Sequence, residues 1–177
     1  MVDHESLIAA FATEGTAVNR ADPARLAGAP FSDSARRILT EIGLPEVFSL
    51  HVNLDSLGRG SVLLREVRDA MRGKKNDQFF YLGSGLHDIG ILLNGHSGEV
   101  FAHVGGQKRR ISPSLDSFVE FLYLMQVQLN ETNKNHWSSE EEIFRMREAT
   151  YAQMTAADAQ AMAEAGDYWR DMFEYSI

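Results

Sequence analysis

The pattern of apolar and polar positions divides the chain into three parts, with helical spacing at both ends and strand-like alternation between them. In the first part, apolar side chains fall on one helical face over residues 3–14 and again over residues 34–42. Gly15 and Gly43 follow these segments, and glycine commonly ends a helix because it adopts the left-handed conformation without strain. The pattern therefore predicts two N-terminal helices separated by an irregular stretch.

Strand-like alternation begins after these helices. Over residues 47–54 apolar side chains occupy every second position, which predicts one strand with a single buried face. Residues 61–72 fit either a helix or a strand, and residues 73–78 read as a polar loop. Glycine-containing turns then separate short apolar runs, and such short connections require antiparallel pairing. The strands predicted from these runs are 79–83, 89–94, 99–104 and 107–111.

Helical spacing returns in the last part of the chain. Ser112 and Pro113 are predicted to open a long helix, because proline suits the first helical position, and its inner face runs as far as Leu129. Residues 130–137 read as a loop. Two capping boxes then predict two more helices, because a hydroxyl and an acidic side chain three residues later satisfy free backbone N–H groups. The first box uses Ser138 or Ser139 with Glu141 or Glu142, and the second uses Thr155 with Asp158.

These elements predict one α+β domain that spans residues 1–177. A central, mainly antiparallel β-sheet (residues 46–111) is flanked by N-terminal helices (1–45) and C-terminal helices (112–177). With 44% hydrophobic and 24% charged residues, the composition is that of an ordinary globular protein. The chain has no cysteine, no secretory leader pattern and no apolar run of membrane-helix length, so we expect a cytoplasmic protein without a membrane partner.

The net charge of −8 is concentrated in the last part of the chain. Residues 138–177 contain nine acidic residues and three arginines, a net charge of −6, whereas the first 137 residues have a net charge of −2. An acidic protein is a poor candidate for binding nucleic acid, because that affinity depends on neutralised phosphates. It is a good candidate for binding a basic protein. A solvated helical surface that only keeps the protein soluble is the alternative interpretation.

No constellation of residues for catalysis, a metal or a cofactor is found in the sequence. None of the six histidines has the spacing of a metal site on a helix or strand. Gly83-Ser84-Gly85 lacks the helix that must follow a phosphate-binding loop, and no serine-hydrolase elbow is present. We therefore expect a protein that is not an enzyme and needs no cofactor. The basic run Lys108-Arg109-Arg110 is expected to form ion pairs or to protect an edge strand.

The C-terminal part also concentrates aromatic side chains. Most aromatics at this spacing belong to a core, but an exposed tryptophan or tyrosine beside acids is typical of interface hot spots. Trp137 on the expected loop and the Tyr168/Tyr175 end of the last helix are the candidate anchors. The candidate partner-binding residues are Trp137, Glu140, Glu141, Asp167, Tyr168, Asp171 and Glu174.

Several short motifs follow one another between residues 34 and 122. They are Gly43-Leu44-Pro45, Leu82-Gly83, Asn94 followed by Gly98-Glu99-Val100, and Ser114-Leu115 with Phe118. In order and spacing they resemble the SUKH superfamily of immunity proteins, in particular its fourth family. The resemblance covers roughly residues 32–125 and implies a single α+β domain with a mainly antiparallel sheet between helices. One departure is Ser112, where the family often has asparagine, although serine caps a helix equally well.

The resemblance implies a non-enzymatic immunity protein that binds and neutralises a bacterial polymorphic toxin encoded by an adjacent gene. Together with the charge pattern, it predicts that the acidic C-terminal part binds a basic toxin domain stoichiometrically. The alternative is an intracellular scaffold or small-ligand-binding module of the same fold, with no toxin partner. That module would use the sheet face around Tyr81, His87 and His103.

Overall fold

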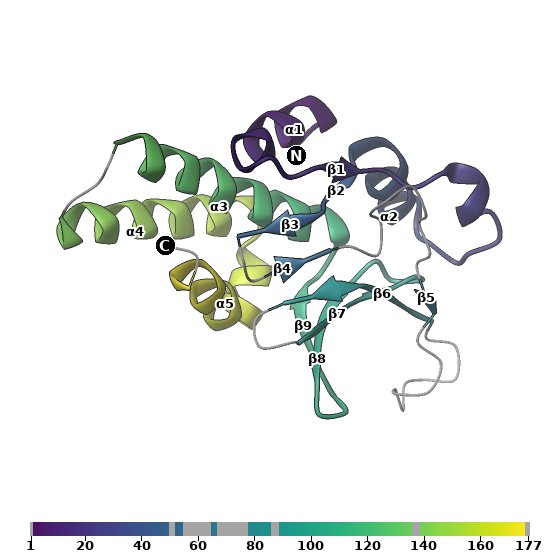
Figure 1. Ribbon diagram of the computed structural model, residues 1–177. Helices are drawn as coiled ribbons and strands as arrows, with labels where there is room; N and C mark the ends of the chain where they lie inside the picture. The colour runs from purple at the N-terminus through teal and green to yellow at the C-terminus, as the bar shows by residue number, and fades with distance from the viewer. Residues whose placement is uncertain are drawn as a thin grey trace.

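The computed structural model describes residues 2–49, 52–54, 65–66, 78–85, 89–135 and 139–175. The helices are α1 (His4–Phe11), α2 (Asp33–Arg37), α3 (Leu115–Asn135), α4 (Glu140–Ala157) and α5 (Ala159–Glu174), with short helical turns at Ala12–Glu14, Pro23–Leu26 and Ile38–Ile42. The strands are β1 (Val18–Asn19), β2 (Leu44–Pro45), β3 (Val47–Phe48), β4 (Val52–Asn53), β5 (Arg65–Glu66), β6 (Phe79–Ser84), β7 (Gly90–Asn94), β8 (Val100–Val104) and β9 (Gln107–Ser112). The predicted α+β class is confirmed: an antiparallel sheet is flanked by N-terminal and C-terminal helices (Figure 1).

The main sheet has the strand order β3-β4-β6-β7-β8-β9, and β5 pairs with β6 outside this path. Every pairing in the described residues is antiparallel. The predicted strands of the central hairpins are confirmed to within one residue at each end. β1 and β2 form a small separate pair, which the sequence pattern did not predict. β9 is an edge strand of the main sheet.

The prediction of a single strand over residues 47–54 is wrong. The chain turns after β3 at Ser49, whose φ is +51°, and β3 pairs with β4, so that Phe48 lies opposite Val52. Alternating apolar side chains fit both arrangements, because Phe48, Val52 and Leu54 are buried in the hairpin as they would be in one strand. Of the segment at residues 61–72, which fits either a helix or a strand, the structure describes only the two residues of β5.

The loop predicted at residues 130–137 is helical over its described part, because α3 continues to Asn135. Asn130 is buried, and its side-chain amide donates to the Ala10 carbonyl of α1 at 2.6 Å. The Gln126 side chain, one turn earlier, donates to the Asn130 side chain at 3.0 Å. These polar residues therefore attach α1 to α3. The sequence alone does not show this, because polar residues are equally common in loops.

Two other helix starts were misplaced by a few residues. Ser112 is the last residue of β9, and α3 begins after Ser114, whose hydroxyl accepts the Ser117 backbone N–H at 3.1 Å. Thr155 lies inside α4, and Asp158 is the N-cap of α5, with its carboxylate accepting a first-turn N–H at 2.9 Å. In both cases the capping side chain stands a few residues beyond the predicted one.

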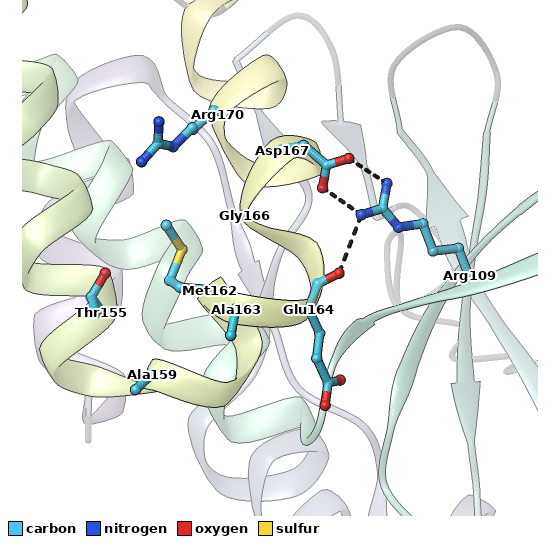
Figure 2. Close-up of a pocket in the computed structure, with 9 residues that line it drawn as sticks. All are labelled: Arg109, Thr155, Ala159, Met162, Ala163, Glu164, Gly166, Asp167 and Arg170. Atoms are coloured by element: carbon cyan, nitrogen blue, oxygen red, sulfur yellow. Dashed lines mark hydrogen bonds and ion pairs between the residues drawn. The ribbon is translucent and has the colours of Figure 1, made fainter.

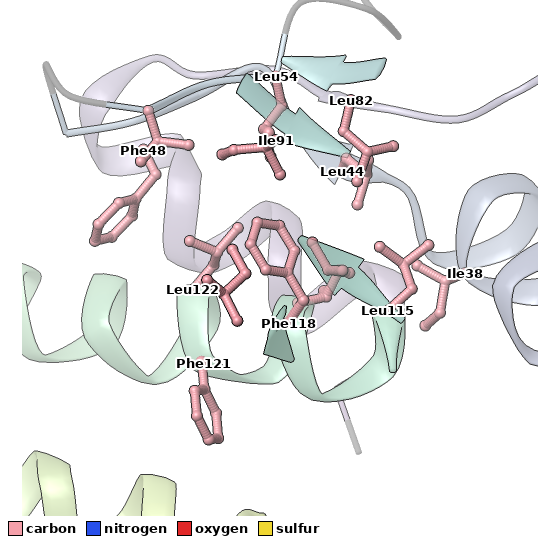
Figure 3. Packing of buried hydrophobic residues seen from close by; sticks show 14 of the residues in the cluster. Ile38, Leu44, Phe48, Leu54, Leu82, Ile91, Leu115, Phe118, Phe121 and Leu122 are labelled. Atoms are coloured by element: carbon pink, nitrogen blue, oxygen red, sulfur yellow. The ribbon is translucent and has the colours of Figure 1, made fainter. Parts of the chain in front are cut away.

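The core lies between the sheet and α3. Phe118 and Leu122 are fully buried and face the strands, where Ile91 of β7 is also fully buried (Figure 3). Each such side chain contributes about 1.5–3 kcal/mol relative to an exposed one. Phe121 faces away from the sheet, and its ring lies 5.0 Å from that of Trp169 in α5. α3 therefore packs against the sheet and against α5 at the same time.

Gly83 is required where β4 approaches β6. A Cβ atom at this position would lie 1.9 Å from the Asn53 carbonyl oxygen, far inside any allowed contact. The register of β6 against β7 also shifts between Tyr81 and Gly83, which marks a bulge. The Leu82-Gly83 motif thus has a local structural reason.

Candidate functional site

The acidic helices α4 and α5 meet at Asp158, and α5 contacts both α4 and the edge strand β9. α3 and α4 extend side by side away from the sheet (Figure 1). Met146, Thr150 and Met154 recur at four-residue spacing and, with Tyr151, form the buried face of α4. The opposite side of α4 is left exposed.

Trp169 fixes α5 to the sheet. Its ring is fully buried, and its indole Nε1–H donates to the Ile111 carbonyl of β9 at 2.8 Å. The ring also lies 5.6 Å from Phe118 and 5.0 Å from Phe121 of α3. One side chain therefore joins α5 to the edge strand and to the central helix.

Arg109 of β9 adds an ionic contact to α5. Its guanidinium forms a two-pronged ion pair with the Asp167 carboxylate, with Nη1 2.8 Å from Oδ2, and Nη2 also donates to the Glu164 carbonyl at 3.2 Å (Figure 2). The bond to Arg109 holds the pKa of Asp167 below its ordinary value, and the same bond raises the pKa of Arg109. Asp167 is therefore already engaged within the protein.

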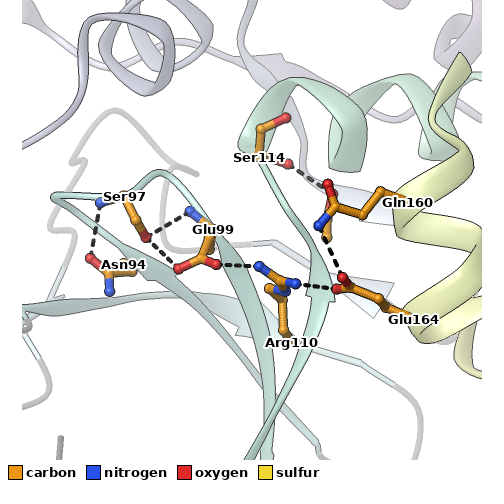
Figure 4. Close-up of polar contacts among 8 residues, drawn as sticks. Asn94, Ser97, Glu99, Arg110, Ser114, Gln160 and Glu164 are labelled. Carbon is orange, nitrogen blue, oxygen red and sulfur yellow. Dashed lines mark hydrogen bonds and ion pairs between the residues drawn. The ribbon is translucent and has the colours of Figure 1, made fainter.

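Arg110, the next residue of β9, joins a turn of the sheet to α5. Its Nη1 lies 2.6 Å from Glu99 Oε1, and its Nη2 forms an ion pair with Glu164 (Figure 4). Ser97 donates to Glu99 at 2.7 Å. Gln160 donates to Glu164 at 3.0 Å, and the contacts with Gln160 and Arg110 lower the pKa of Glu164. The prediction that the basic run forms ion pairs is confirmed for both arginines.

α4 and α5 come together around Tyr151. Its ring lies 6.0 Å from that of Phe173, edge to face, and the Arg170 guanidinium lies 5.0 Å from its centre. Burial, reinforced by the Glu174 carboxylate, raises the pKa of Tyr151 to about 12. Arg147 and Arg170 lower this pKa and Glu148 raises it slightly, so charged groups of both helices act on the same hydroxyl.

An open groove of about 640 Å3 lies between the end of α4 and the first half of α5 (Figure 2). α5 departs from helical geometry at Ala165, where φ is −138° and ψ is 21°. Ala159 and Ala163 are among the small side chains that line the groove. Its polar lining includes Arg109 and Asp167, which satisfy each other.

The other predicted acids lie exposed along both helices. Glu140 and Glu141 occupy the first turn of α4, where carboxylates also favour the positive end of the helix dipole. Glu141 is 3.5 Å from Arg145 in an exposed ion pair. Asp171 and Glu174 are exposed on α5. The structure therefore spreads these acids over a surface and does not gather them in one pocket.

The predicted aromatic anchors differ in their surroundings. Trp137 lies outside the described residues. Tyr168 is half-buried, its ring packs edge-on against Trp169 at 5.6 Å, and a Cβ on Gly85 would lie 3.1 Å from its hydroxyl. Burial raises the pKa of Tyr168 above its ordinary value. Tyr175 is 59% exposed. Tyr168 thus takes part in the packing of α5 and does not offer the exposed tip expected from the sequence.

Phe144 is an exposed aromatic residue that the sequence pattern did not indicate as a binding residue. It is 62% exposed, the highest value for a large apolar side chain among the described residues. It lies on α4, away from the buried face that contains Met146 and Thr150. The helical period gave no clear signal, because it separates position 144 from Met146 but places it almost in line with Tyr151, which is buried two turns later.

The alternative site on the sheet is described in part. Tyr81 and His103 both flank Gly90, and a Cβ built on this glycine would lie 3.6 Å and 3.8 Å from their side chains. The Nε2 of His103 is buried and has no hydrogen-bond partner in the described part of the chain. His87 lies outside the described residues. The structure therefore brings together two of the three residues named for this alternative.

Within the described residues, no three histidine, cysteine, aspartate or glutamate side chains come together as they would around a metal ion. Among the helices of this part of the chain, none combines the length and apolar character needed to span a bilayer. The surface of α4 and α5 instead offers charge and apolar contact, which suit the binding of another protein.

Nearly the whole chain matches one family model. The model is described as SUKH-4 immunity protein, and the match covers residues 2–175. No curated protein and no solved structure matches the chain. The match extends beyond residues 32–125, the range of the sequence motifs, and includes α1 and both acidic helices. The chain therefore belongs to the SUKH-4 family of immunity proteins.

Proposed function

We propose that this protein neutralises a toxin by stoichiometric binding, through exposed carboxylates of α4 and α5, and without a chemical reaction. The observation that carries the proposal is an acidic face, defined here as Glu140, Glu141, Glu148, Asp171 and Glu174, all of them exposed. Membership of a family of immunity proteins supports a toxin as the partner. The toxin is proposed to be encoded by an adjacent gene and to be bound in the cytoplasm.

The charge of the acidic face favours a basic toxin domain. The protein has a net charge of −8, of which −6 comes from residues 138–177. Exposed carboxylates attract lysine and arginine over about 8 Å at physiological salt, and this attraction accelerates encounter more than it strengthens the final complex. We therefore expect fast, salt-sensitive association.

A second candidate function is a scaffold or small-ligand-binding module. The buried, unpartnered Nε2 of His103, noted above within the described residues, favours this alternative because a bound polar group could satisfy it. Tyr81 would form the other side of such a site. This function requires no toxin, so the experiment below separates the two candidates.

The test is co-purification of the tagged protein with the product of the adjacent gene, at low salt and at about 0.5 M NaCl, where screening shortens to about 4 Å. A one-to-one complex that weakens in salt, together with rescue of cells that express the toxin, is the expected result. No complex and no rescue would overturn the toxin-binding proposal and leave the scaffold or ligand-binding function as the leading candidate.

Charge reversal locates the binding surface. Glu140→Lys with Glu141→Lys on α4, and separately Asp171→Lys with Glu174→Lys on α5, should each weaken binding about 10-fold or more and flatten its salt dependence. The matched control is Glu14→Lys with Glu41→Lys, which makes the same change in net charge at exposed acids of the N-terminal region. An equal loss in the control would show that total charge alone matters and would remove the acidic face as the binding site.

A further inference from the structure

We infer that Phe144 is the apolar anchor of this interface and inserts into an apolar pocket with a basic rim on the toxin domain. The inference rests on the proposed function and deepens it, because it names the residue at the centre of the contact. It also states the chemistry that the partner must present.

The surroundings of Phe144 differ from those of the other aromatic residue on α4. Tyr151 is 5% exposed, and it has Phe173 and Arg170 as ring contacts. Phe144 is 62% exposed. One helix thus carries an aromatic side chain that packs inside the protein and one that points into solvent. A phenylalanine ring exposed to this extent is suited to burial by a partner.

Three of the four residues that neighbour Phe144 along the helix surface are acidic. Glu140 and Glu141 precede it by four and three residues, Glu148 follows it by four, and the fourth neighbour is Arg147. Residues at these spacings are neighbours on one side of a helix, about 5–6 Å apart at Cβ. The three acids are exposed, whereas Arg147 is partly buried. The result is an apolar centre with a mainly acidic rim, which corresponds to the arrangement of a hot-spot residue inside a polar ring.

The charge pattern around Phe144 favours one kind of binding partner. A second copy of the protein related by a two-fold axis would place the acidic rim against another acidic rim, which is repulsive. An anionic membrane surface would be repelled for the same reason. A protein pocket lined by apolar side chains and edged by lysine or arginine would complement both parts of the patch. We identify this partner as the basic toxin domain.

Val104 provides a matched comparison. It is 60% exposed, almost the same as Phe144, but it lies at the end of β8. Lys108 and Arg109, rather than acids, follow it in the adjoining strand β9. Val104 therefore shares the apolar exposure of Phe144 without the acidic rim, and it should contribute nothing to binding a basic partner.

The experiment compares Phe144→Ala with Val104→Ala in binding to the purified toxin domain, by calorimetry and by surface plasmon resonance. Phe144→Ala should weaken binding about 30-fold or more, mainly through faster dissociation, and should keep the salt dependence of the wild type. Val104→Ala should stay within about threefold of the wild type. Both substitutions are at exposed positions, so each variant should fold, and the unfolding midpoint of each variant is measured to check this.

The failure of this inference can be told apart from failure of the proposed function. If the wild type binds the toxin and Phe144→Ala binds it equally well, the anchor is wrong and the proposed function stands. If the wild type does not bind the toxin, the proposed function itself fails. If the wild type is a dimer that Phe144→Ala converts to a monomer, a second copy occupies the patch and the inference is overturned.

A photocrosslinking amino acid at position 144 gives an independent readout. It should crosslink to a segment of the toxin that contains lysine or arginine, and the same probe at position 104 should not crosslink. A complex that forms normally but gives no crosslink from position 144 would overturn the inference.

Discussion

Helices α4 and α5 each carry four acidic residues, but the two sets have different surroundings. On α5, Glu164 and Asp167 are paired with Arg110 and Arg109 of the edge strand. On α4, Glu141 has only an exposed contact with Arg145 at 3.5 Å, among the ion pairs described for this helix. Glu164 and Asp167 therefore attach α5 to the sheet, whereas Asp171 and Glu174 of the same helix and the acids of α4 remain exposed.

The difference follows from the position of the basic residues. β9 carries Lys108-Arg109-Arg110, and α5 is the acidic helix that packs on this strand. α4 packs against α3 and α5 through Met146, Thr150 and Met154, so its acids have no basic strand beside them. The acids of α5 beside β9 thus have a role in the fold, whereas the acids of α4, together with Asp171 and Glu174, belong to the proposed binding surface.

The largest expected effect comes from removing the main attachment of α5. Trp169→Ala should lower the free energy of unfolding by about 3–5 kcal/mol, because it removes a fully buried ring and leaves the Ile111 carbonyl without its donor. Trp169→Phe should lower the free energy of unfolding by less, because phenylalanine keeps most of the packing. Phe144→Ala, an exposed aromatic of α4, should change the free energy of unfolding by no more than about 0.5 kcal/mol. Urea unfolding measures all three, and equal stability of Trp169→Ala and Phe144→Ala would refute the comparison.

A smaller effect is expected for the ion pairs. Arg110→Ala removes contacts with Glu99 and Glu164 and should cost about 1 kcal/mol at low salt. Arg145→Ala, whose contact with Glu141 is exposed, should cost no more than about 0.3 kcal/mol. The difference between the variants should narrow in about 0.5 M NaCl, because salt screens exposed pairs. A larger loss of stability for Arg145→Ala would contradict the different roles assigned to Glu164 and Glu141.

The smallest expected effect is on the pH dependence of stability. The pKa values of Glu164 and Asp167 are lowered in the folded protein from ordinary values of 4.5 and 3.8, so both acids bind protons more readily when the chain unfolds. Their stabilisation is present above those ordinary values and is lost as the pH falls through the lowered ones. The double variant Glu164→Gln, Asp167→Asn should therefore lose less stability than the wild type between about pH 5 and pH 3. The urea unfolding midpoints of both proteins are measured across this pH range. If the midpoints of the wild type and the double variant change in parallel, protonation of these two acids is not linked to folding.

Much of the sheet could be predicted because its constraints are local. Short turns force antiparallel pairing, and the hairpin strands were located to within one residue at each end. The turn at Ser49 was missed, because alternating apolar positions fit one strand as well as a tight hairpin. The role of Asn130 was missed for a similar reason, since its partner is the Ala10 carbonyl, 120 positions away.

The candidate site was predictable in its charge but not in its anchors. The exposed acids followed from the capping box at the start of α4 and from the acidic composition. The burial of Tyr168 depends on how α5 sits on β9, and the pairing of Asp167 depends on Arg109, 58 positions earlier. Such long-range contacts are not encoded in local spacing. The exposure of Phe144 could not be predicted from the helical period either, because Tyr151, seven residues later and almost in line with it, is buried.

The attachment of α5 to β9 also sets an order of events during synthesis on the ribosome. Trp169 is made 58 residues after Ile111, which corresponds to roughly 3–12 seconds at ordinary elongation rates. During that interval β9 is a nascent edge strand without its helix, and an uncovered edge can pair with another chain. Lys108, Arg109 and Arg110 give this strand a run of like charges, which disfavours its pairing with the same strand of a neighbouring nascent chain. The residues that later hold α5 in place therefore first act as a safeguard against aggregation between nascent chains.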